Sequence, residues 1–257
     1  MRTLSIDCGG TGIKAQVWES QRGGAGPRPS LTPASTELRM PTPYPLPPHV
    51  FVETLVDLQA RLPRADRATV GMPGVIRHGV VVHTPHYITT TGPHSPVDPD
   101  LRTAWAGLDV KAATERALGL PAQVCNDAEM HAAQLATGKG LELVLTLGTG
   151  LGAALLDDGV VAPHLEFSHA PIRRGRTIDQ YIGEAARLRI GRSPWSRRVE
   201  EMVDLLWPVI CWDRLYLGGG NAARLTEAVR ERIGPNVVLV PGNAALPGGA
   251  RLWDLPA

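Results

Sequence analysis

A glycine-rich turn between two apolar segments occurs twice in this sequence, and this repeat constrains the fold more than any other feature. The first copy spans residues 3–18 with its turn at 8–12, and the second spans residues 143–156 with its turn at 147–150. In each copy the pattern predicts a strand, a turn and a strand that returns antiparallel. Such an internal duplication predicts two lobes of one type, each offering a glycine loop to a shared cleft.

The rest of the chain alternates between predicted strands and helices, which is typical of an α/β fold. Further strands are expected at residues 69–71, 75–82, 213–217 and in a segment ending at Val124, and helices at 50–62, 108–118, 128–137, 178–188, 198–211 and 221–232. Segment 21–48, rich in Pro, Gly and Ser, and the polar segment 83–99 are predicted to be loops or extended connections. Ligands of α/β folds bind at the carboxyl ends of strands, so residues that follow strands are site candidates.

The composition excludes several classes of partner. The 257 residues carry a net charge of +1, so no strong field draws the chain to nucleic acid or to a membrane. No apolar run approaches the roughly 18 residues that span a bilayer, and the N-terminus lacks a signal-peptide pattern. The three cysteines are widely spaced, which favours reduced thiols over disulfides. We therefore expect a cytoplasmic protein with no nucleic-acid or membrane partner. Arginines gather between residues 173 and 198, where a polyanion site is one interpretation and a solvated helical face the favoured one.

The glycine loops are candidates for phosphate binding. Without a Cβ, their backbone N–H groups can approach a phosphate closely and form an anion nest. The glycines concerned are Gly9, Gly10, Gly148, Gly150, Gly218, Gly219 and Gly220. Tight hairpins alone would also explain one such loop, but three loops that each follow a strand favour phosphate.

Four polar side chains in these loops or beside them extend this interpretation. Thr11 and Thr149 add hydroxyl donors, and Lys14 adds a charge that could reach a transferred phosphoryl group. Asp7 would repel a phosphate unless a cation lies between them, which indicates Mg²⁺ held directly or through water.

Asn126 and Asp127 lie between a predicted strand and a predicted helix. Both residue types favour helix N-caps, and capping is the ordinary interpretation. The functional interpretation makes Asp127 the general base that accepts a proton from an attacking hydroxyl in phosphoryl transfer.

Glu166 and His169 form a second polar pair. A carboxylate with a nearby imidazole could accept and donate hydrogen bonds to vicinal sugar hydroxyls, whereas a surface turn without a ligand is the alternative. No cysteine cluster accompanies His169, so a structural zinc site has little support.

Six motifs occur in a fixed order: DCGGTGIK at 7–14, VGMPGV at 70–75, ND at 126–127, TLGTGLG at 146–152, EFSH at 166–169 and LGGG at 217–220. Together they resemble the ROK family (repressors, open reading frames and sugar kinases) over nearly the whole chain. In lacking a zinc-binding cysteine motif, the chain resembles the polyphosphate glucokinase branch of this family.

The resemblance implies an actin-like, ribonuclease H-like duplicated fold with two lobes around a cleft. It implies an N-terminal phosphate-binding lobe, about residues 1–125, and a C-terminal sugar and nucleotide lobe, about 126–257. It further implies Mg²⁺, polyphosphate or ATP as phosphoryl donor, a hexose acceptor, and a homodimer. Asp127 is then the general base, and the sugar contacts are Gly74, Asn126, Glu166 and His169.

Three positions depart from the family pattern. His86 stands where an asparagine commonly contacts the sugar, Ser168 replaces a glycine, and Asp179 stands near the place of a second sugar-binding glutamate. We count His86 and Asp179 among the sugar-binding candidates, and we expect that glucose is not the best substrate. The segment 247–250 is expected to interrupt a helix.

Two functions from different classes follow. The first is a sugar kinase. The second is a non-catalytic sugar- or phosphate-sensing protein of the same fold, which the three departures favour and which the presence of Asp7, Lys14 and Asp127 disfavours.

Overall fold

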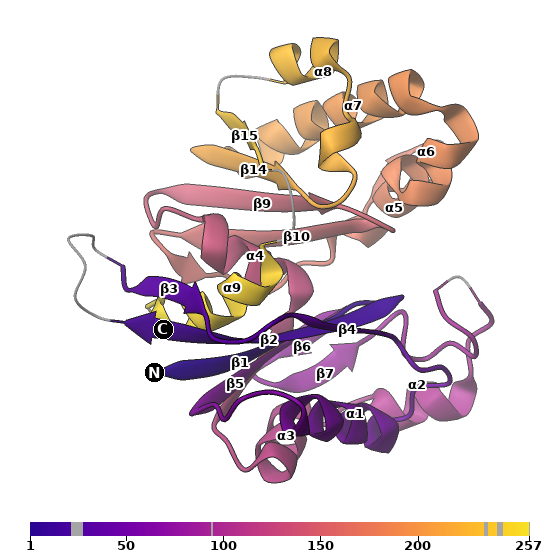
Figure 1. Cartoon of the computed structure of the whole chain (residues 1–257). Helices are drawn as coiled ribbons and strands as arrows, with labels where there is room; N and C mark the ends of the chain where they lie inside the picture. The colour runs from indigo at the N-terminus through magenta and orange to yellow at the C-terminus, as the bar shows by residue number, and fades with distance from the viewer. Residues whose placement is uncertain (22–27, 94, 234–235, 241–243, 257) are drawn as a thin grey trace. The chain divides into compact units, whose positions relative to one another are not determined.

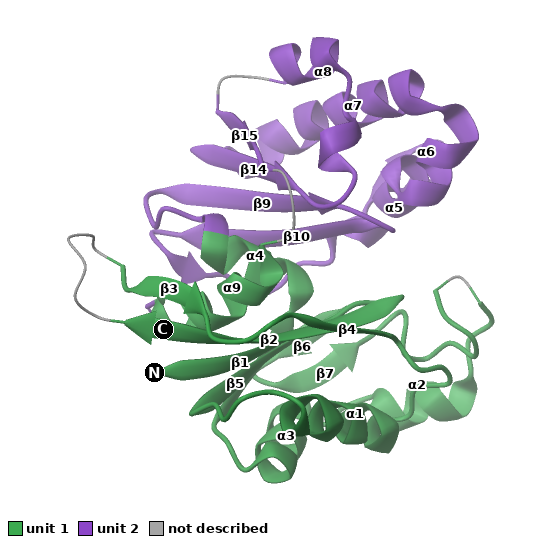
Figure 2. Cartoon of the chain, in the orientation of Figure 1, with its two compact units in different colours: residues 1–134, 244–255 green, residues 135–243, 256–257 purple. Residues whose placement is uncertain are grey.

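The computed structural model describes residues 1–21, 28–93, 95–233, 236–240 and 244–256. Strands and helices alternate along the chain (Figure 1). The chain divides into two compact units, one of residues 1–134 and 244–255, the other of residues 135–243 and 256–257 (Figure 2). The predicted lobes, 1–125 and 126–257, are defined by what they bind and stay a prediction.

The first unit is built on a six-stranded sheet. Its order is β3-β2-β1-β5-β8, with β4 also paired to β2. The strands are β1 (Arg2–Cys8), β2 (Gly12–Gln21), β3 (Ser30–Pro33), β4 (Leu38–Pro41), β5 (Arg67–Met72) and β8 (Ala122–Asn126). The antiparallel hairpin β1–β2 continues into parallel β5 and β8, and β1 and β5 are buried almost throughout, as expected of central strands covered on both faces.

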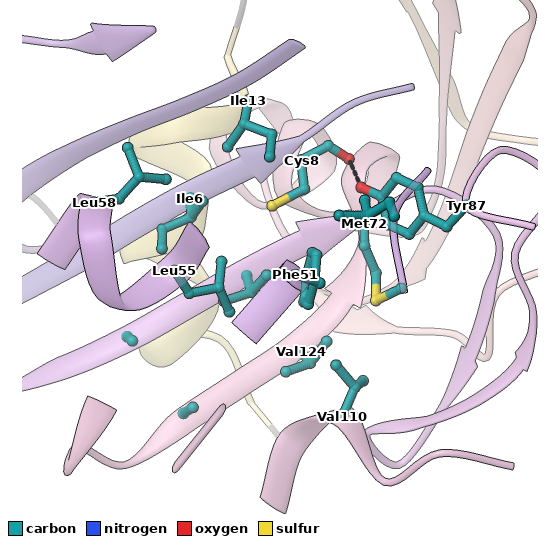
Figure 3. Close-up of a cluster of buried hydrophobic side chains, with 14 of the residues drawn as sticks. Ile6, Cys8, Ile13, Phe51, Leu55, Leu58, Met72, Tyr87, Val110 and Val124 are labelled. Carbon is teal, nitrogen blue, oxygen red and sulfur yellow. Dashed lines mark hydrogen bonds between the residues drawn. The ribbon is translucent and has the colours of Figure 1, made fainter. Parts of the chain in front are cut away.

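Helices cover both faces of this sheet (Figure 1). The elements are α1 (Pro48–Ala60), α2 (Pro99–Trp105), α3 (Val110–Leu118), α4 (Asp127–Leu135), α9 (Ala245–Arg251), the short helix η3 (Leu252–Asp254) and the hairpin β6 (Val75–Arg77)–β7 (Val80–His83). Leu4, Ile6 and Cys8 of β1 join the core cluster that α1 and α3 complete (Figure 3). Because side chains alternate along a strand, Ser5 and Asp7 face the opposite side, where α4 and α9 lie.

The second unit repeats this plan. Its sheet has the order β11-β10-β9-β14-β15, with an antiparallel hairpin β9–β10 followed by parallel β14 and β15. The strands are β9 (Leu141–Leu147), β10 (Leu151–Asp157), β11 (Val160–Val161), β14 (Arg214–Gly218) and β15 (Val237–Leu239). The duplication predicted from the sequence is therefore confirmed.

The other elements of the second unit are short strands and helices, apart from one long helix. They are η1 (Phe167–His169), β12 (Pro171–Arg173), β13 (Arg176–Thr177), α5 (Ile178–Ile182), α6 (Glu184–Ile190), α7 (Arg192–Ile210), η2 (Ala222–Arg224) and α8 (Glu227–Arg232). No helix in the described ranges is long and apolar enough to cross a membrane.

Several predicted boundaries were wrong. The helix expected at 178–188 is broken at Gly183, where a Cβ would lie 2.7 Å from the carbonyl oxygen of Asp179 and 2.8 Å from that of Thr149. The helix expected at 221–232 is split into η2 and α8. Segment 21–48 contributes β3 and β4, because β2 is long enough to pair with both. Part of this segment, residues 22–27, lies outside the described residues.

The expected interruption at 247–250 was also wrong, because α9 runs through it. Pro247 lies in the first turn, where its missing N–H is not needed. Gly248 and Gly249 are required by packing, since a Cβ at either position would overlap the backbone of Met130 or the hydroxyl of Ser5. The glycines thus let the helix approach α4 and β1 closely.

Candidate active site

The hairpin β1–β2 carries a buried ion pair beside its glycine loop. Asp7 and Lys14 are opposite each other in the register, and Lys14 Nζ lies 3.3 Å from Asp7 Oδ2. Asp7 is buried and Lys14 is about a quarter exposed. The lysine charge is therefore fixed by the strand pairing at the base of the loop.

The loop itself is packed against the segment that follows β7. A Cβ at Gly10 would lie 2.9 Å from His86 Cδ2 and 2.9 Å from Pro93 Cγ, so only glycine fits without a shift. His86, a predicted sugar contact, therefore lies directly beside a predicted phosphate-binding glycine.

Asn126 forms the N-cap of α4. Its Oδ1 accepts a hydrogen bond from Ala128 N at 2.8 Å, and Glu129 Oε2 accepts one from Asn126 N at 2.8 Å. Asn126 thus caps the helix through the N–H of its second residue, with Glu129 reaching back as in a capping box, and the capping interpretation is confirmed for Asn126. Its Nδ2 also donates to the carbonyl oxygen of Gly74 at 2.9 Å, which ties α4 to the end of the β5–β6 connection.

Asp127 follows as the first residue of α4, with Oδ1 3.0 Å from Ala128 N. The helix dipole favours a negative charge at this end. Burial, and then Asp7 and Asp127, raise the pKa of the Cys8 thiol, so both carboxylates lie near Cys8. One turn further, burial lowers the pKa of His131, with Asp7 opposing this shift and Lys14 adding to it. The first unit thus gathers Asp7, Lys14, Asp127 and His131.

Glu166 is the centre of a polar cluster in the second unit. Ser168 Oγ donates to Glu166 Oε1 at 2.5 Å, and His164 Nε2 lies 3.5 Å from Glu166 Oε2. Burial raises the pKa of Glu166, but the neighbouring His164 imidazole and the Ser168 hydroxyl lower it by more, so the pKa lies below its ordinary value. The carboxylate is therefore held ionised. His169 lies in η1, and its N–H donates to the carbonyl oxygen of Glu166 at 3.2 Å.

The side chains of Asp179 and Asn221 hydrogen-bond to the backbone of the second glycine loop. Asp179 Oδ1 accepts from Leu151 N at 2.7 Å, and its carboxylate occupies the space beside Gly150. Asn221, just after the third glycine run, donates from Nδ2 to the carbonyl oxygen of Gly148 at 3.1 Å and to Glu184 Oε2 at 2.7 Å. The run 218–220 is close as well, because a Cβ at Gly219 would lie 2.5 Å from Leu147 O. The structure thus brings together the loops 148–150 and 218–220 within one unit.

The chain is similar over most of its length to known sugar kinases. The chain is 25% identical over 232 residues to polyphosphate glucokinase of Mycobacterium tuberculosis, which covers 87% of this chain and 79% of the relative. It is 26% identical to an inorganic polyphosphate/ATP-glucomannokinase of Arthrobacter sp. strain KM, with a TM-score of 0.76 and coverage of 98% and 97%. The chain is a homologue of polyphosphate glucokinases. No protein-family model matches it.

This polyphosphate glucokinase homologue also shares its fold with more distant sugar kinases. A ROK family glucokinase of Streptomyces griseus, solved with glucose and AMPPNP, is 18% identical with a TM-score of 0.71 and covers 98% of this chain and 99% of its own. The expected actin-like fold is thereby confirmed.

The carboxylate of Asp7 is the candidate ligand for a magnesium ion in this homologue. No group of three or more His, Cys, Asp or Glu side chains that could hold a metal occurs among the described residues. Mg²⁺ is commonly held by one or two carboxylates together with water and substrate phosphates. The buried Asp7, beside the glycine loop, fits that mode.

Sequence reasoning missed four polar residues that the structure places at or beside the candidates. His164 contacts Glu166, and Glu129 contacts Asn126. His131 lies one turn after Asp127. Asn221 contacts Gly148. The N-x-x-E spacing of a capping box could have pointed to Glu129. His164 and His131 lie two and four residues from the candidates Glu166 and Asp127, whereas Asn221 depends on a contact between separate segments, for which the sequence carries no local signal.

Proposed function

We propose that this chain is a sugar kinase that transfers a phosphoryl group from polyphosphate or ATP to a hydroxyl of a hexose. Similarity over almost the full length of both chains to the polyphosphate/ATP-glucomannokinase of Arthrobacter carries this proposal. That protein's description names both donors and two related acceptors, glucose and mannose, and so defines the substrate class proposed here.

Asp127 acts as the general base in this mechanism. Phosphoryl transfer requires little covalent chemistry from the protein, because positioning of the substrates and neutralisation of charge account for most of the reduction in the barrier. The carboxylate at the start of α4 accepts the proton of the attacking sugar hydroxyl. Asn126, fixed by Gly74 and by the helix cap, orients the same end of the helix.

The sugar is held by hydrogen bonds to fixed polar groups. Glu166 is kept ionised and accepts from sugar hydroxyls, with His169 beside it. The other proposed contacts are Gly74, Asn126, His86 and Asp179. One oxygen of Asp179 already accepts from Leu151 N, so its sugar contact would use the remaining lone pairs.

The phosphoryl donor is held by the glycine loops. The groups proposed for this role are Asp7, Gly9, Gly10, Thr11, Lys14, Gly148, Thr149, Gly150, Gly218, Gly219 and Gly220. Mg²⁺ held at Asp7 would neutralise charge on the donor phosphates. Lys14 is fixed 3.3 Å from Asp7 and supplies a second positive charge at the same loop. The proposal also includes a cytoplasmic location and a homodimer, the latter to be measured by light scattering after gel filtration.

The test is a panel of hexoses with Mg²⁺, run in parallel with ATP and with polyphosphate. We expect sugar-dependent consumption of at least one donor, with mannose or a glucose analogue turned over better than glucose. A folded protein that consumes neither donor with any sugar would overturn the proposal. Turnover of glucose as fast as, or faster than, that of its analogues would overturn the expectation about specificity.

One observation favours the sensor as a second candidate. The Ser168 hydroxyl occupies an acceptor site on Glu166 that a glycine at this position would leave open. Stabilisation by a sugar in thermal unfolding, without turnover of either donor, would support a sensor over a kinase.

A further inference from the structure

Three consecutive carbonyl groups of the first glycine loop accept hydrogen bonds from side-chain hydroxyls. Tyr87 Oη donates to Cys8 O (Figure 3), Thr42 Oγ1 to Gly9 O, and Tyr44 Oη to Gly10 O, each at 2.8 Å. All of these residues belong to the first unit. Thr42, Tyr44 and Tyr87 lie outside the six sequence motifs.

The direction of each carbonyl fixes the direction of the next N–H group. In a trans peptide the C=O of one residue and the N–H of the following residue point in opposite directions. Thr42 and Tyr44 therefore turn the N–H groups of Gly10 and Thr11 away from themselves. Neither N–H donates a hydrogen bond within the described residues, whereas Gly9 N donates to Gly12 O at 2.9 Å.

The hydroxyls are themselves held in place. Tyr87 is fully buried and packs on the rings of Phe51 and Trp105, with centroid separations of 5.7 and 5.4 Å. Trp105 Nε1 donates to Leu46 O at 2.8 Å, which anchors the segment that carries Thr42 and Tyr44. Burial raises the pKa of Tyr44 to about 12, so this hydroxyl keeps the proton that it donates.

We propose that Thr42, Tyr44 and Tyr87 form a hydroxyl clamp, a set of positioning residues that aims the Gly10 and Thr11 N–H groups at a phosphate of the phosphoryl donor. The inference rests on the proposed function and adds residues to it that lie outside the glycine motif. Backbone donors aimed in advance bind an anion without reorganisation at the moment of transfer. The clamp affects binding of the phosphoryl donor and does not affect binding of the hexose.

The test compares Thr42→Val, Tyr44→Phe and Tyr87→Phe, each of which removes a hydroxyl and keeps the size of the side chain. We expect Thr42→Val and Tyr44→Phe to raise KM for the donor about fivefold each, the loss of roughly one net hydrogen bond, with KM for the sugar changed less than twofold. Tyr87→Phe should have a smaller effect, because the N–H that it orients already donates to Gly12 O. Thr54→Val is the matched control, since it removes a buried hydroxyl that donates to Val50 O at 2.7 Å within α1.

A second measurement separates this inference from the kinase proposal. Binding of inorganic tripolyphosphate is titrated calorimetrically without sugar, for the wild type and each variant. If the wild type binds tripolyphosphate without turning over, and Thr42→Val and Tyr44→Phe weaken binding about fivefold, the clamp stands while the kinase proposal fails. If the wild type turns over and these variants keep the wild-type donor KM and affinity, or raise both KM values equally, the clamp is overturned while the kinase stands. If the wild type neither turns over nor binds tripolyphosphate, both are overturned.

Discussion

The two glycine hairpins share one plan, but only the first has a charged pair next to its turn. In β1–β2 the pair before the turn is Asp7 opposite Lys14, whereas in β9–β10 the corresponding pair is Thr146 opposite Gly152. The first turn is also one residue longer, since it joins Cys8 to Ile13 while the second joins Leu147 to Leu151. The comparison shows that a strand–loop–strand frame can be repeated while the charged pair next to its loop is present in one copy only.

The two loops are also supported differently. Hydroxyls hold the carbonyl groups of the first loop, whereas Asp179 and Asn221 hold an N–H and a carbonyl group of the second. A carboxylate lies next to each loop, but the one beside the first loop is paired with Lys14, whose positive charge favours the most negative part of a donor. We therefore expect the transferred phosphoryl group to lie at the first loop.

Removal of the carboxylate of Asp127 should have the largest effect. Asp127→Asn removes the proton acceptor and should lower kcat about 10²- to 10⁴-fold, as sugar-dependent donor consumption would show. Asp57→Asn, on the exposed face of α1, is the control. Near-normal turnover of Asp127→Asn would assign the base to another residue, with His131 the first to examine.

Replacing Lys14 would remove the positive charge from the position of the first hairpin that corresponds to Gly152 in the second. Lys14→Met should lower kcat/KM for the donor about 10²-fold, because a charge aimed at the phosphoryl group is lost. Lys139→Met, at an exposed position before β9, should leave kcat/KM unchanged. Equal losses in both variants would show that net charge, rather than the hairpin position, matters.

One added methyl group should disrupt the close packing of α9 in the first unit. Gly248→Ala should lower the free energy of unfolding by about 2 to 3 kcal/mol, because the Cβ would overlap the Met130 carbonyl. Chemical denaturation measures this loss. Gly107→Ala, where nothing lies within 4 Å, should lose only the smaller amount due to its left-handed backbone. Similar losses for both would mean that α9 can shift away.

Acid sensitivity should come from the second sheet. Glu142 is buried in β9 and accepts from Thr137 N, Gly138 N and Tyr216 Oη, whereas the matching strand position in β1 is the neutral Thr3. Burial raises the pKa of Glu142, but these hydrogen bonds lower it overall. Its stabilisation is therefore complete above the unfolded pKa, about 4.3, and is lost as the pH falls through the lower folded pKa.

Glu142→Gln tests this assignment. It should lower the free energy of unfolding by about 2 kcal/mol at pH 7, since an amide cannot accept from all of these donors. The same variant should show a weaker loss of stability between pH 5 and pH 3 than the wild type. An unchanged acid limb would place the titrating group elsewhere. Glu53→Gln, exposed on α1, serves as the control.

The smallest effect is expected at Ser168. Ser168→Gly frees an acceptor site on Glu166 and should lower KM for the hexose about threefold, without a change in KM for the donor. A higher hexose KM would show that the serine positions Glu166 instead of competing with the sugar.

Features that depend on neighbours in sequence were predictable. The glycine turns, their antiparallel strands and the junction at Asn126 follow from local pattern, and the duplication follows from comparing one half with the other. The rest depends on distant packing. Edge pairing with β2 made strands of β3 and β4 in a Pro-rich segment, and close contact with α4 and β1 kept Gly248 and Gly249 inside a helix. The hydroxyl clamp joins residues that are far apart in sequence, so no spacing rule would have found it.

The return of α9 to the first unit has a consequence for synthesis on the ribosome. Thr69 Oγ1 donates to Gly249 O at 2.7 Å and Trp253 Nε1 donates to Thr69 Oγ1 at 2.8 Å, so residues 244–255 complete a sheet whose strands were translated much earlier. Until these residues leave the exit tunnel, the face of β1 and β5 that they cover stays open to water and to chaperones. The first unit thus cannot finish folding until residues 244–255, which follow the second sheet in the sequence, have been translated.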